Sequence, residues 1–346
     1  MRVLHLPTNV ASQISVSVRG LRQIGVEARG LVDSNLYRSC TGTETLRELP
    51  VKGFRRRALG RASQYAQILR GVLWADVVHW HGTWGLRSAI DLRLARWLGK
   101  KRVVEFWGSE IRVPEIEAAA NPYYSQAYRG GYEYRLAESA DASLARQLPF
   151  ARCGATAITS RGLRPHLRRD LFRGDFVLEG RVCLEDFPAT YPDTGRSNPL
   201  VLHSSTAPIC KGTPAVLQAV EEARKDRVFQ FQFVHATPLT ESRDLVRRCD
   251  IFLDQFVVGY FGLAAIEAMA FGKPVVCFIK PSLIGAYPEG LPIVNATQET
   301  LACVLGRLID DGVLRHELGV RGRRYVEQHH SANHAAEALR EIYEKV

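Results

Sequence analysis

The stretch Asp250–Phe278, DIFLDQFVVGYFGLAAIEAMAFGKPVVCF, contains an apolar strand, a loop with glycines, a helix and a second apolar strand. Two glycines of the loop, Gly259 and Gly262, relieve backbone crowding where a ligand approaches. A helix is predicted from about Leu263, and the first N–H groups of a helix have no partner within it. The stretch therefore predicts a site for an anion such as a diphosphate at the start of this helix.

Glu267 lies one turn into the predicted helix, so its side chain projects near the same helix end. A carboxylate in that position can accept hydrogen bonds from ribose hydroxyls, and one ligand would then be held by its phosphate and its sugar. The pattern has a second interpretation. A glycine turn between strand and helix is common in α/β proteins, and a single glutamate in a first turn often complements only the helix dipole.

The run Phe261–Val276, FGLAAIEAMAFGKPVV, resembles the signature of retaining, nucleotide-sugar-dependent glycosyltransferases of family 4. The resemblance extends over most of the chain. It includes the opening strand–helix–strand, an FWGSEIR element at 106–112, a Lys-Gly turn at 211–212 and a closing segment at 324–327. It implies that Glu267 contacts the ribose of a nucleotide diphosphate sugar. The loop residues implied to hold this donor are Gly259, Tyr260, Phe261, Gly262 and Leu263.

The length of 346 residues suits two domains of roughly 150 residues each. A hydrophobic content of 46% and a charged content of 24% are globular values. No apolar run approaches the length of a membrane span and the N-terminus lacks a signal-peptide layout, so we expect a cytoplasmic protein. The seven cysteines are scattered without paired spacing, which indicates neither a disulfide framework nor a zinc site.

The net charge of +10 is distributed unevenly, because residues 1–196 hold 30 Lys+Arg against 19 Asp+Glu while residues 197–346 hold 16 against 17. The excess predicts an anionic partner for the first domain, and a solvated basic face is the alternative. Because no recognised nucleic-acid motif accompanies the charge, we expect no nucleic acid as partner and keep a peripheral site on the inner face of the membrane as the alternative to a wholly cytoplasmic location. The basic runs are 52–61, KGFRRRALGR, and a set with helix-like spacing, Arg161, Arg164, Arg168, Arg169 and Arg173.

Strands and helices are predicted to alternate along the chain, which is typical of parallel sheets covered by helices. Strands are predicted at 2–7, 26–32, 75–81, 102–107, 155–159, 175–179, 200–203 and 229–234, and helices at 14–24, 86–98, 213–223, 298–309, 313–328 and 332–345. Residues 188–199, PATYPDTGRSNP, have the composition of a linker. Two α/β domains joined in this way leave a cleft, which is a preferred location for ligands.

The resemblance implies the GT-B fold, in which two Rossmann-like α/β domains face each other across a cleft and the C-terminal helix crosses back to the N-terminal domain. We expect an N-terminal acceptor domain over residues 1–190, completed by a helix at about 331–346. A C-terminal nucleotide-sugar domain is expected over residues 198–330.

The segment 203–213, HSSTAPICKGT, follows the first predicted strand of the second domain and places Lys211 at a predicted helix start. A cation is unfavourable at that end of a helix unless it faces an anion, although an exposed lysine beside a glycine is also commonplace. The resemblance implies that Lys211 neutralises the donor diphosphate, with Ser204 and Ser205 alongside. Thr206 stands where relatives usually carry an arginine.

The resemblance also leads us to expect a second glutamate, eight positions before Glu267, that contacts the donor sugar. That position is Gly259 in this chain, so the expected carboxylate is absent. Asp254 or Gln255, on the same strand end, is a candidate substitute, and capping of the turn is the alternative role of Asp254.

Two segments of the first domain, 79–84 (HWHGTW) and 105–112 (EFWGSEIR), follow strands whose carboxyl ends line ligand crevices in open parallel sheets. Relatives carry a histidine where Trp107 stands, so a general-base role is lost there, and the indole either stacks on a sugar ring or packs in the core. We expect His79 and His81 to point to opposite or alternate faces of their strand. The candidates for acceptor or sugar contacts are His81, Trp107, Glu110 and Arg112.

The function predicted is that of a retaining glycosyltransferase, with a UDP-sugar favoured as donor, an acceptor hydroxyl, no bound cofactor and no metal. It would act in polysaccharide, glycolipid or secondary-metabolite synthesis, with Lys211 and Glu267 as its catalytic residues. A sugar-nucleotide epimerase, a catalytically silent nucleotide-sugar-binding subunit and a nucleic-acid binder stay open as alternatives. A glycosidase that used Glu105 and Glu110 would leave Lys211 and Glu267 without a role.

Overall fold

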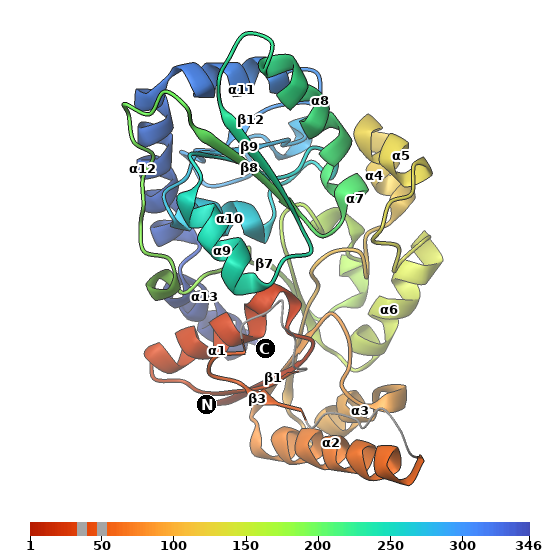
Figure 1. Ribbon diagram of the computed structural model, residues 1–346. Coiled ribbons are helices and arrows are strands. Elements are labelled where there is room, and N and C mark those ends of the chain that lie inside the picture. The colour runs from red at the N-terminus through yellow and green to blue at the C-terminus, as the bar shows by residue number, and fades with distance from the viewer. Residues whose placement is uncertain (33–39, 47–53) are drawn as a thin grey trace. The chain divides into compact units, whose positions relative to one another are not determined.

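The structure of the protein is a computed structural model that describes residues 1–32, 40–46 and 54–346. The chain forms two compact units, each with a parallel sheet between helices (Figure 1). The first unit consists of residues 1–112, 137–179 and 332–346, and the second of residues 113–136 and 180–331. No helix among the described residues is both long and apolar enough to cross a membrane.

The sheet of the first unit has seven strands in the order β3-β2-β1-β4-β5-β6-β7, and all its pairs are parallel. The strands are β1 (Arg2–Pro7), β2 (Glu27–Val32), β3 (Glu44–Thr45), β4 (Val77–His81), β5 (Lys101–Glu105), β6 (Thr156–Thr159) and β7 (Asp175–Val177). The helices are α1 (Gln13–Gln23), α2 (Phe54–Trp74), α3 (Ile90–Trp97), α6 (Ala140–Arg152) and α13 (Ala332–Lys345). Short 3-10 turns lie at Val10–Ser12, Arg87–Ala89, Arg164–His166 and Arg169–Leu171.

Alternation along the strands divides the core of this unit into two layers. Leu4 and Leu6 of β1 belong to the apolar layer that contains residues of α2 and α3. Val3 belongs to the other layer, with residues of α1 and α13. Because successive strand residues point to opposite faces, His5 shares the face of Val3 and lies under α1 and α13.

The C-terminal helix α13 belongs to the first unit, as predicted from the resemblance. Leu339 and Tyr343 of this helix are buried among α1 and the sheet. Gly20 of α1 permits the close approach, because a Cβ atom at this position would lie 2.4 Å from the carbonyl oxygen of Ala332. The helix therefore completes a face of a sheet whose first strand lies at the other end of the sequence (Figure 1).

The sheet of the second unit has five parallel strands in the order β12-β11-β10-β8-β9. They are β8 (Leu200–Ser205), β9 (Gln230–His235), β10 (Ile251–Leu253), β11 (Val275–Cys277) and β12 (Val294–Asn295). The helices are α4 (Pro114–Ala120), α5 (Pro122–Arg129), α7 (Pro208–Lys211), α8 (Thr213–Ala223), α9 (Leu239–Arg248), α10 (Leu263–Ala270), α11 (Leu301–Asp310) and α12 (Gly312–His329). Further 3-10 turns lie at Leu184–Asp186 and Pro281–Leu283.

Most predicted elements are present, and the differences have local causes. The helix predicted at 86–98 is a 3-10 turn followed by α3, with Ser88 and Ala89 in left-handed backbone conformations. Helices α2, α4, α5, α6, α7 and α9 were not predicted. The chain passes from the first compact unit into the second at residues 179–180, and the second unit also includes residues 113–136. We expected the division between domains near the linker at 188–199, and that domain division stays a prediction.

The contact between α1 and α13 yields a prediction for Gly20→Ala. Alanine raises helix propensity by about 1 kcal/mol relative to glycine. The added methyl group would meet a backbone carbonyl at 2.4 Å, so one helix must shift. We expect the clash to dominate and to lower the free energy of unfolding by about 1–3 kcal/mol. Urea denaturation measures this change, with Gln23→Ala on the exposed side of α1 as control; a variant as stable as the parent would show that α13 does not need the close approach.

Candidate functional site

The candidate site lies at the carboxyl ends of β8 and β10, which are neighbours in the second sheet. The strand order reverses between them, because β8 pairs with β9 on one side and β10 on the other, while β11 and β12 follow beyond β10. Ligands of open α/β sheets bind outside the carboxyl ends of strands at such a switch point. The loops that leave β8 and β10, residues 206–212 and 254–262, both begin there.

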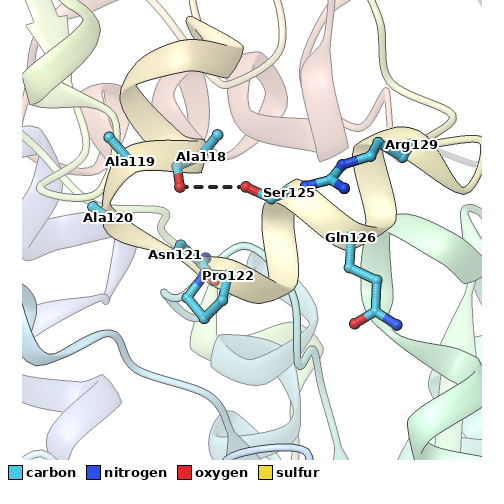
Figure 2. Close-up of a pocket in the computed structure, with 8 residues that line it drawn as sticks. All are labelled: Ala118, Ala119, Ala120, Asn121, Pro122, Ser125, Gln126 and Arg129. Atoms are coloured by element: carbon cyan, nitrogen blue, oxygen red, sulfur yellow. Dashed lines mark hydrogen bonds between the residues drawn. The ribbon is translucent and has the colours of Figure 1, made fainter.

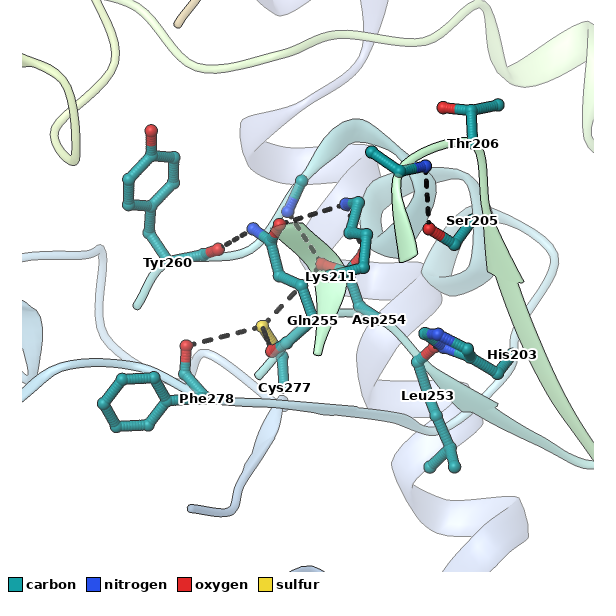
Figure 3. Close-up of polar contacts among 12 residues, drawn as sticks. His203, Ser205, Thr206, Lys211, Leu253, Asp254, Gln255, Tyr260, Cys277 and Phe278 are labelled. Carbon is teal, nitrogen blue, oxygen red and sulfur yellow. Dashed lines mark hydrogen bonds and ion pairs between the residues drawn. The ribbon is translucent and has the colours of Figure 1, made fainter. Parts of the chain in front are cut away.

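Lys211 and the loop after β10 meet at this point (Figure 3). The ammonium of Lys211 lies 3.3 Å from Oδ1 of Asp254 and donates a hydrogen bond to Oε1 of Gln255 at 3.0 Å. A Cβ atom on Gly262 would lie 3.2 Å from the same ammonium. The structure therefore brings the lysine to the residue that precedes α10, and a glycine at 262 leaves room for it.

The buried side chain of Asp254 stabilises the loop after β10. Its Oδ2 accepts a hydrogen bond from the backbone N–H of Gly262 at 2.8 Å, and its side chain is buried. Gln255 also supports the loop by donating to the carbonyl of Tyr260. Asp254 thus contacts both the lysine and the loop, which is the capping role that the sequence left open for it.

The charge of Lys211 is maintained by Asp254. Burial alone would lower the pKa of the lysine, but the neighbouring carboxylate raises it above its ordinary value. Lys211 is the last residue of the short helix α7, and Gly212, with a φ of 76°, is the N-cap of α8. Lys211 therefore lies just before the start of α8, as predicted, and it also ends a short helix that was not predicted. Its ammonium is directed at the start of a different helix, α10.

Glu267 lies on α10 and pairs with an arginine that the sequence analysis missed. Its Oε1 accepts hydrogen bonds from Nη2 and Nε of Arg243 on α9, at 2.8 and 3.3 Å. The guanidinium of Arg243 also lies over the ring of Phe187, 4.6 Å from its centroid. Both members of the ion pair are partly exposed. Glu267 is thus held in a defined orientation one turn from the start of α10.

Gly259 occupies a position where a side chain would not fit easily. Its φ is 84°, and a Cβ atom would lie 3.0 to 3.2 Å from three carbon atoms of the Lys280 side chain. Lys280 is buried and its ammonium pairs with Glu117 at 2.9 Å. The space next to residue 259 is therefore filled by the stem of a lysine. This explains physically why the glutamate expected at this position is replaced by glycine.

Segment 113–136 forms hydrogen bonds with the segments that follow β8 and β10. The sequence gave no indication of this role. Asn121 donates to the carbonyl of Val257 at 2.6 Å. The carboxylate of Glu133 accepts from the backbone N–H groups of Ile209 and Cys210 at 2.7 and 2.8 Å. A hollow of about 550 Å³ lies on the same segment, lined by residues between Ala118 and Arg129, and none of the predicted site residues lines it (Figure 2).

The other residues predicted to contact the nucleotide-sugar donor differ in their exposure to solvent. Ser204 is partly exposed, whereas Ser205 is buried and accepts from the N–H of Ala207 at 3.0 Å. Tyr260 and Phe261 are buried, so these two residues offer mainly backbone groups. Leu263 and the following alanine are partly exposed, which leaves the first turn of α10 accessible.

The four candidate residues of the first unit gather beyond β4 and β5. His81 is fully buried, and Nε1 of Trp107 donates to its Nδ1 at 3.2 Å. Trp107 is partly exposed, and its backbone N–H donates to the carboxylate of Glu110. Burial raises the pKa of Glu110, although the hydrogen bond from Trp107 opposes the shift. Arg112 is buried close to Gly108.

The expectation for the two histidines of β4 was wrong. The rings of His79 and His81 stack with centroids 4.6 Å apart, on the same face of the sheet. Residues i and i+2 of a strand share a face, so the spacing required this result. The ring of His5 on β1 packs beside them, with its centroid 4.6 Å from that of His79 and 5.2 Å from that of His81.

The basic clusters differ from their predicted form. The five arginines between 161 and 173 are not on one helix, because this region consists of 3-10 turns and loops. Arg164 and Arg169 both pair with Asp175, and Arg161 pairs with Glu179. These ion pairs neutralise much of the cluster. In the run 52–61, residues 52 and 53 lie outside the described residues; Phe54 begins α2, and Leu59 on that helix is exposed.

Comparisons with known proteins agree with the architecture. Residues 213–325 match the family model described as Glycosyl transferases group 1. The comparison with curated protein sequences found no match. Among solved structures, sucrose-phosphate synthase from Thermosynechococcus elongatus is similar, with a TM-score of 0.64 and 14% identity over 100% of this chain and 99% of that chain.

Two further solved structures are similar over almost the whole chain. A glycosyltransferase from Rickettsia africae has a TM-score of 0.63 and 15% identity, and 99% of this chain and 97% of that chain are covered. Anabaena HepE, in complex with UDP and glucose, has a TM-score of 0.57 and 14% identity over 100% of both chains. The fold predicted from the sequence is confirmed: the chain has the GT-B fold, with a Rossmann-like parallel sheet in each unit.

His203 of β8, beneath the site, yields a prediction about pH. Its imidazole is fully buried and lies 2.9 Å from both the carbonyl of Leu253 and the hydroxyl of Thr213. Burial lowers its pKa from 6.5 to about 4, although the Leu253 carbonyl opposes the shift. Because the unfolded chain takes up this proton first, the stabilisation is complete above pH 6.5 and is lost as the pH falls towards 4.

We expect protonation of His203 to lower the free energy of unfolding by up to about 3 kcal/mol. Urea denaturation at several pH values between 6.5 and 4 measures it, with His203→Gln as the comparison. The parent should lose more stability than the variant over this range. Parallel stability curves for the two proteins would contradict a buried neutral imidazole.

Proposed function

We propose that the protein is a glycosyltransferase that moves a sugar from a nucleotide diphosphate sugar to an acceptor hydroxyl. The observation that carries this proposal is the meeting of the Lys211 ammonium with the start of α10 at the switch point of the second sheet. Residues 213–325, which contain α10, match a glycosyltransferase family model. A cation and unpaired helix N–H groups directed at one point form a site for a diphosphate.

The charges of the site define how a diphosphate is held. Asp254 keeps Lys211 protonated and directed at Gly262, while itself occupying the N–H of that glycine. The N–H groups of the next residues, on the accessible first turn of α10, are then the ones that contact phosphate oxygens. In the reaction, the diphosphate leaves with its negative charge stabilised by this lysine and helix end. Such preorganised electrostatic stabilisation contributes several kcal/mol to catalysis.

Glu267 supplies the second half of the donor site in this proposal. Its position one turn into α10 suits hydrogen bonds from ribose hydroxyls. Arg243 holds the carboxylate in place, so it acts as a positioning residue. We favour UDP as the nucleotide because structures of Anabaena HepE, which shares the fold, contain UDP and UDP-glucose.

Several finer features of the proposal derive from the resemblance to family 4. They are front-face attack with retention of the anomeric configuration and transfer of a hexose. The first unit would receive the acceptor, and its excess of basic residues suits an anionic or membrane-associated acceptor. The proposed location is therefore cytoplasmic, with a peripheral site on the membrane where the acceptor is a lipid.

Ligand screening by thermal shift is the first test. UDP, GDP and their sugars are compared at equal concentration, because a ligand that binds only the folded state raises the unfolding temperature with occupancy. We expect UDP and at least one UDP-sugar to stabilise the protein. Stabilisation by none of these ligands would refute the proposal, and stabilisation without transfer to any acceptor or water would favour a silent binding subunit.

The role of Lys211 is tested by Lys211→Ala, with Lys225→Ala, at an exposed position just after α8, as control. Loss of a charge contact to the diphosphate should cost about 2 kcal/mol or more, so kcat/KM for the donor should fall at least about 30-fold. Donor turnover is measured as UDP release. A variant within about threefold of the parent would show that Lys211 does not contact the phosphate.

A second substitution separates the ribose contact from the phosphate contact. Glu267→Gln removes the negative charge and keeps the side-chain length, so UDP affinity should fall on the order of tenfold. Affinity for inorganic pyrophosphate should stay unchanged, whereas Lys211→Ala should weaken both ligands. Calorimetric titration measures the four affinities. If Glu267→Gln weakened both ligands equally, Glu267 would act through the fold of α10 and not through the ribose.

A further inference from the structure

Three histidines of the first unit form a buried cluster that the proposed function does not use. His5 comes from β1, and His79 and His81 come from β4; the side chains of all three are fully buried. Each offers a ring nitrogen to a common space, and these three atoms lie within 4.8 Å of one another. The closest pair is Nδ1 of His5 and Nε2 of His81, at 2.9 Å.

A carboxylate lies beside two of these imidazoles. Oε2 of Glu105, on the neighbouring strand β5, lies 3.5 Å from Nε2 of His79 and 3.9 Å from Nδ1 of His81. Glu105 is 1% exposed, so its negative charge is buried among imidazoles. An imidazole balances that charge only when it is protonated, whereas a divalent cation balances it with all three rings neutral.

We propose that His5, His79 and His81 bind a divalent first-row transition metal, with Zn²⁺ the best fit, and that Glu105 supplies the fourth ligand. Three imidazoles and one carboxylate form a donor set that suits Zn²⁺ in tetrahedral geometry. Zinc–nitrogen bonds of about 2.0–2.1 Å place tetrahedral ligand atoms about 3.3 Å apart. One separation is 2.9 Å and all three ligand atoms lie within 4.8 Å of one another, so the spacing suits such a site. The stacked rings of His79 and His81 must turn to direct their nitrogens at one metal.

Tyr343 of α13 provides the outer contact that metal-binding histidines commonly have. Its hydroxyl lies 2.7 Å from Nδ1 of His79 and 3.3 Å from Nε2 of His5. A hydrogen bond to one ring nitrogen fixes the orientation of the ring, and the other nitrogen is then directed at the metal. For His79 that other nitrogen is the one that faces Glu105.

The position of the cluster in the sheet also favours a ligand. In the first sheet the strand order reverses between β1 and β4, because β2 and β3 lie beyond β1 while β5 to β7 lie beyond β4. His5 and His79 are direct partners in the register of these two strands. The histidines therefore flank the switch point of the first sheet, near the carboxyl ends of its strands.

Metal binding would change the environment of Trp107. The indole now donates to Nδ1 of His81. Coordination through Nε2 of His81 requires the proton on Nδ1, which would turn towards Glu105 and replace the contact with the indole. Metal binding would thus release the indole of Trp107, which is partly exposed, from its contact with His81.

The competing account is a metal-free chain of hydrogen bonds. Trp107 donates to His81, His81 to His5, His5 to Tyr343, Tyr343 to His79, and His79 approaches Glu105. This chain is consistent with three neutral imidazoles and is the arrangement expected if no metal binds. The two accounts differ in a measurable quantity, the metal content of the protein.

The test uses untagged full-length protein. Metal is removed with a chelator, the protein is reconstituted with Zn²⁺, and bound metal is measured by mass spectrometry together with competition against a chromophoric chelator. We expect about one Zn²⁺ per chain. His5→Gln and His79→Gln should each lower the Zn²⁺ affinity by about 100-fold or more, whereas His334→Gln on the exposed side of α13 should not change it.

Two results would overturn the proposal. One is reconstituted parent protein with less than about a tenth of an equivalent of metal. The other is a folded glutamine variant, verified by circular dichroism, that binds Zn²⁺ as tightly as the parent. Should both variants fail to fold, X-ray absorption of the parent decides: imidazole scattering from nitrogen ligands supports the site, and sulfur ligands place the metal at the cysteines and refute it. The readouts do not depend on transferase activity.

Discussion

The pairing of β8 with β10 is the constraint on which the candidate site depends. Parallel neighbours end at the same edge of a sheet, so the loops after them meet although 43 residues separate Lys211 from Asp254. Their ion pair fixes the lysine against Gly262. Because the helix that follows this glycine begins at the same edge, a positive side chain and the positive end of a helix dipole point to one location. An anion bound at this location would contact both.

A buried ion pair and a glutamate that caps a helix support the loops around this location. Lys280 and Glu117 hold segment 113–136 against the loop after β11, and Glu133 caps the short helix that carries Lys211. Breaking a buried ion pair by removing one partner is far more destabilising than breaking an exposed pair. Residues without any contact to a ligand therefore determine the shape of the site. The buried stem of Lys280, for example, fills the space next to Gly259 and leaves no room there for a carboxylate side chain.

The sequence was sufficient for the features that arise from local pattern. Helices α8 and α13 begin and end at the residues predicted, because both have apolar periodicity and Gly212 and Pro214 mark the start of α8. Lys211, Asp254, Gln255 and Gly262 meet because the order of strands in α/β sheets follows from few rules. The partner of Glu267 was not predictable, since Arg243 lies on a helix with little apolar signal. The histidine cluster was not predicted either, because His5 and His79 become neighbours only through the register of β1 with β4.

The way in which α13 closes the first unit affects how the chain reaches its native state. The units are built from three and two segments, so the backbone passes between them at residues 112–113, 136–137, 179–180 and 331–332. The helix that covers Val3, Val77 and Val103 is translated after the entire second unit. During synthesis this face of the first sheet stays uncovered while some 150 residues are added, which is the condition under which chaperones bind nascent chains. The five-stranded unit can complete its core first, so the half of the protein made earliest is the half that matures last.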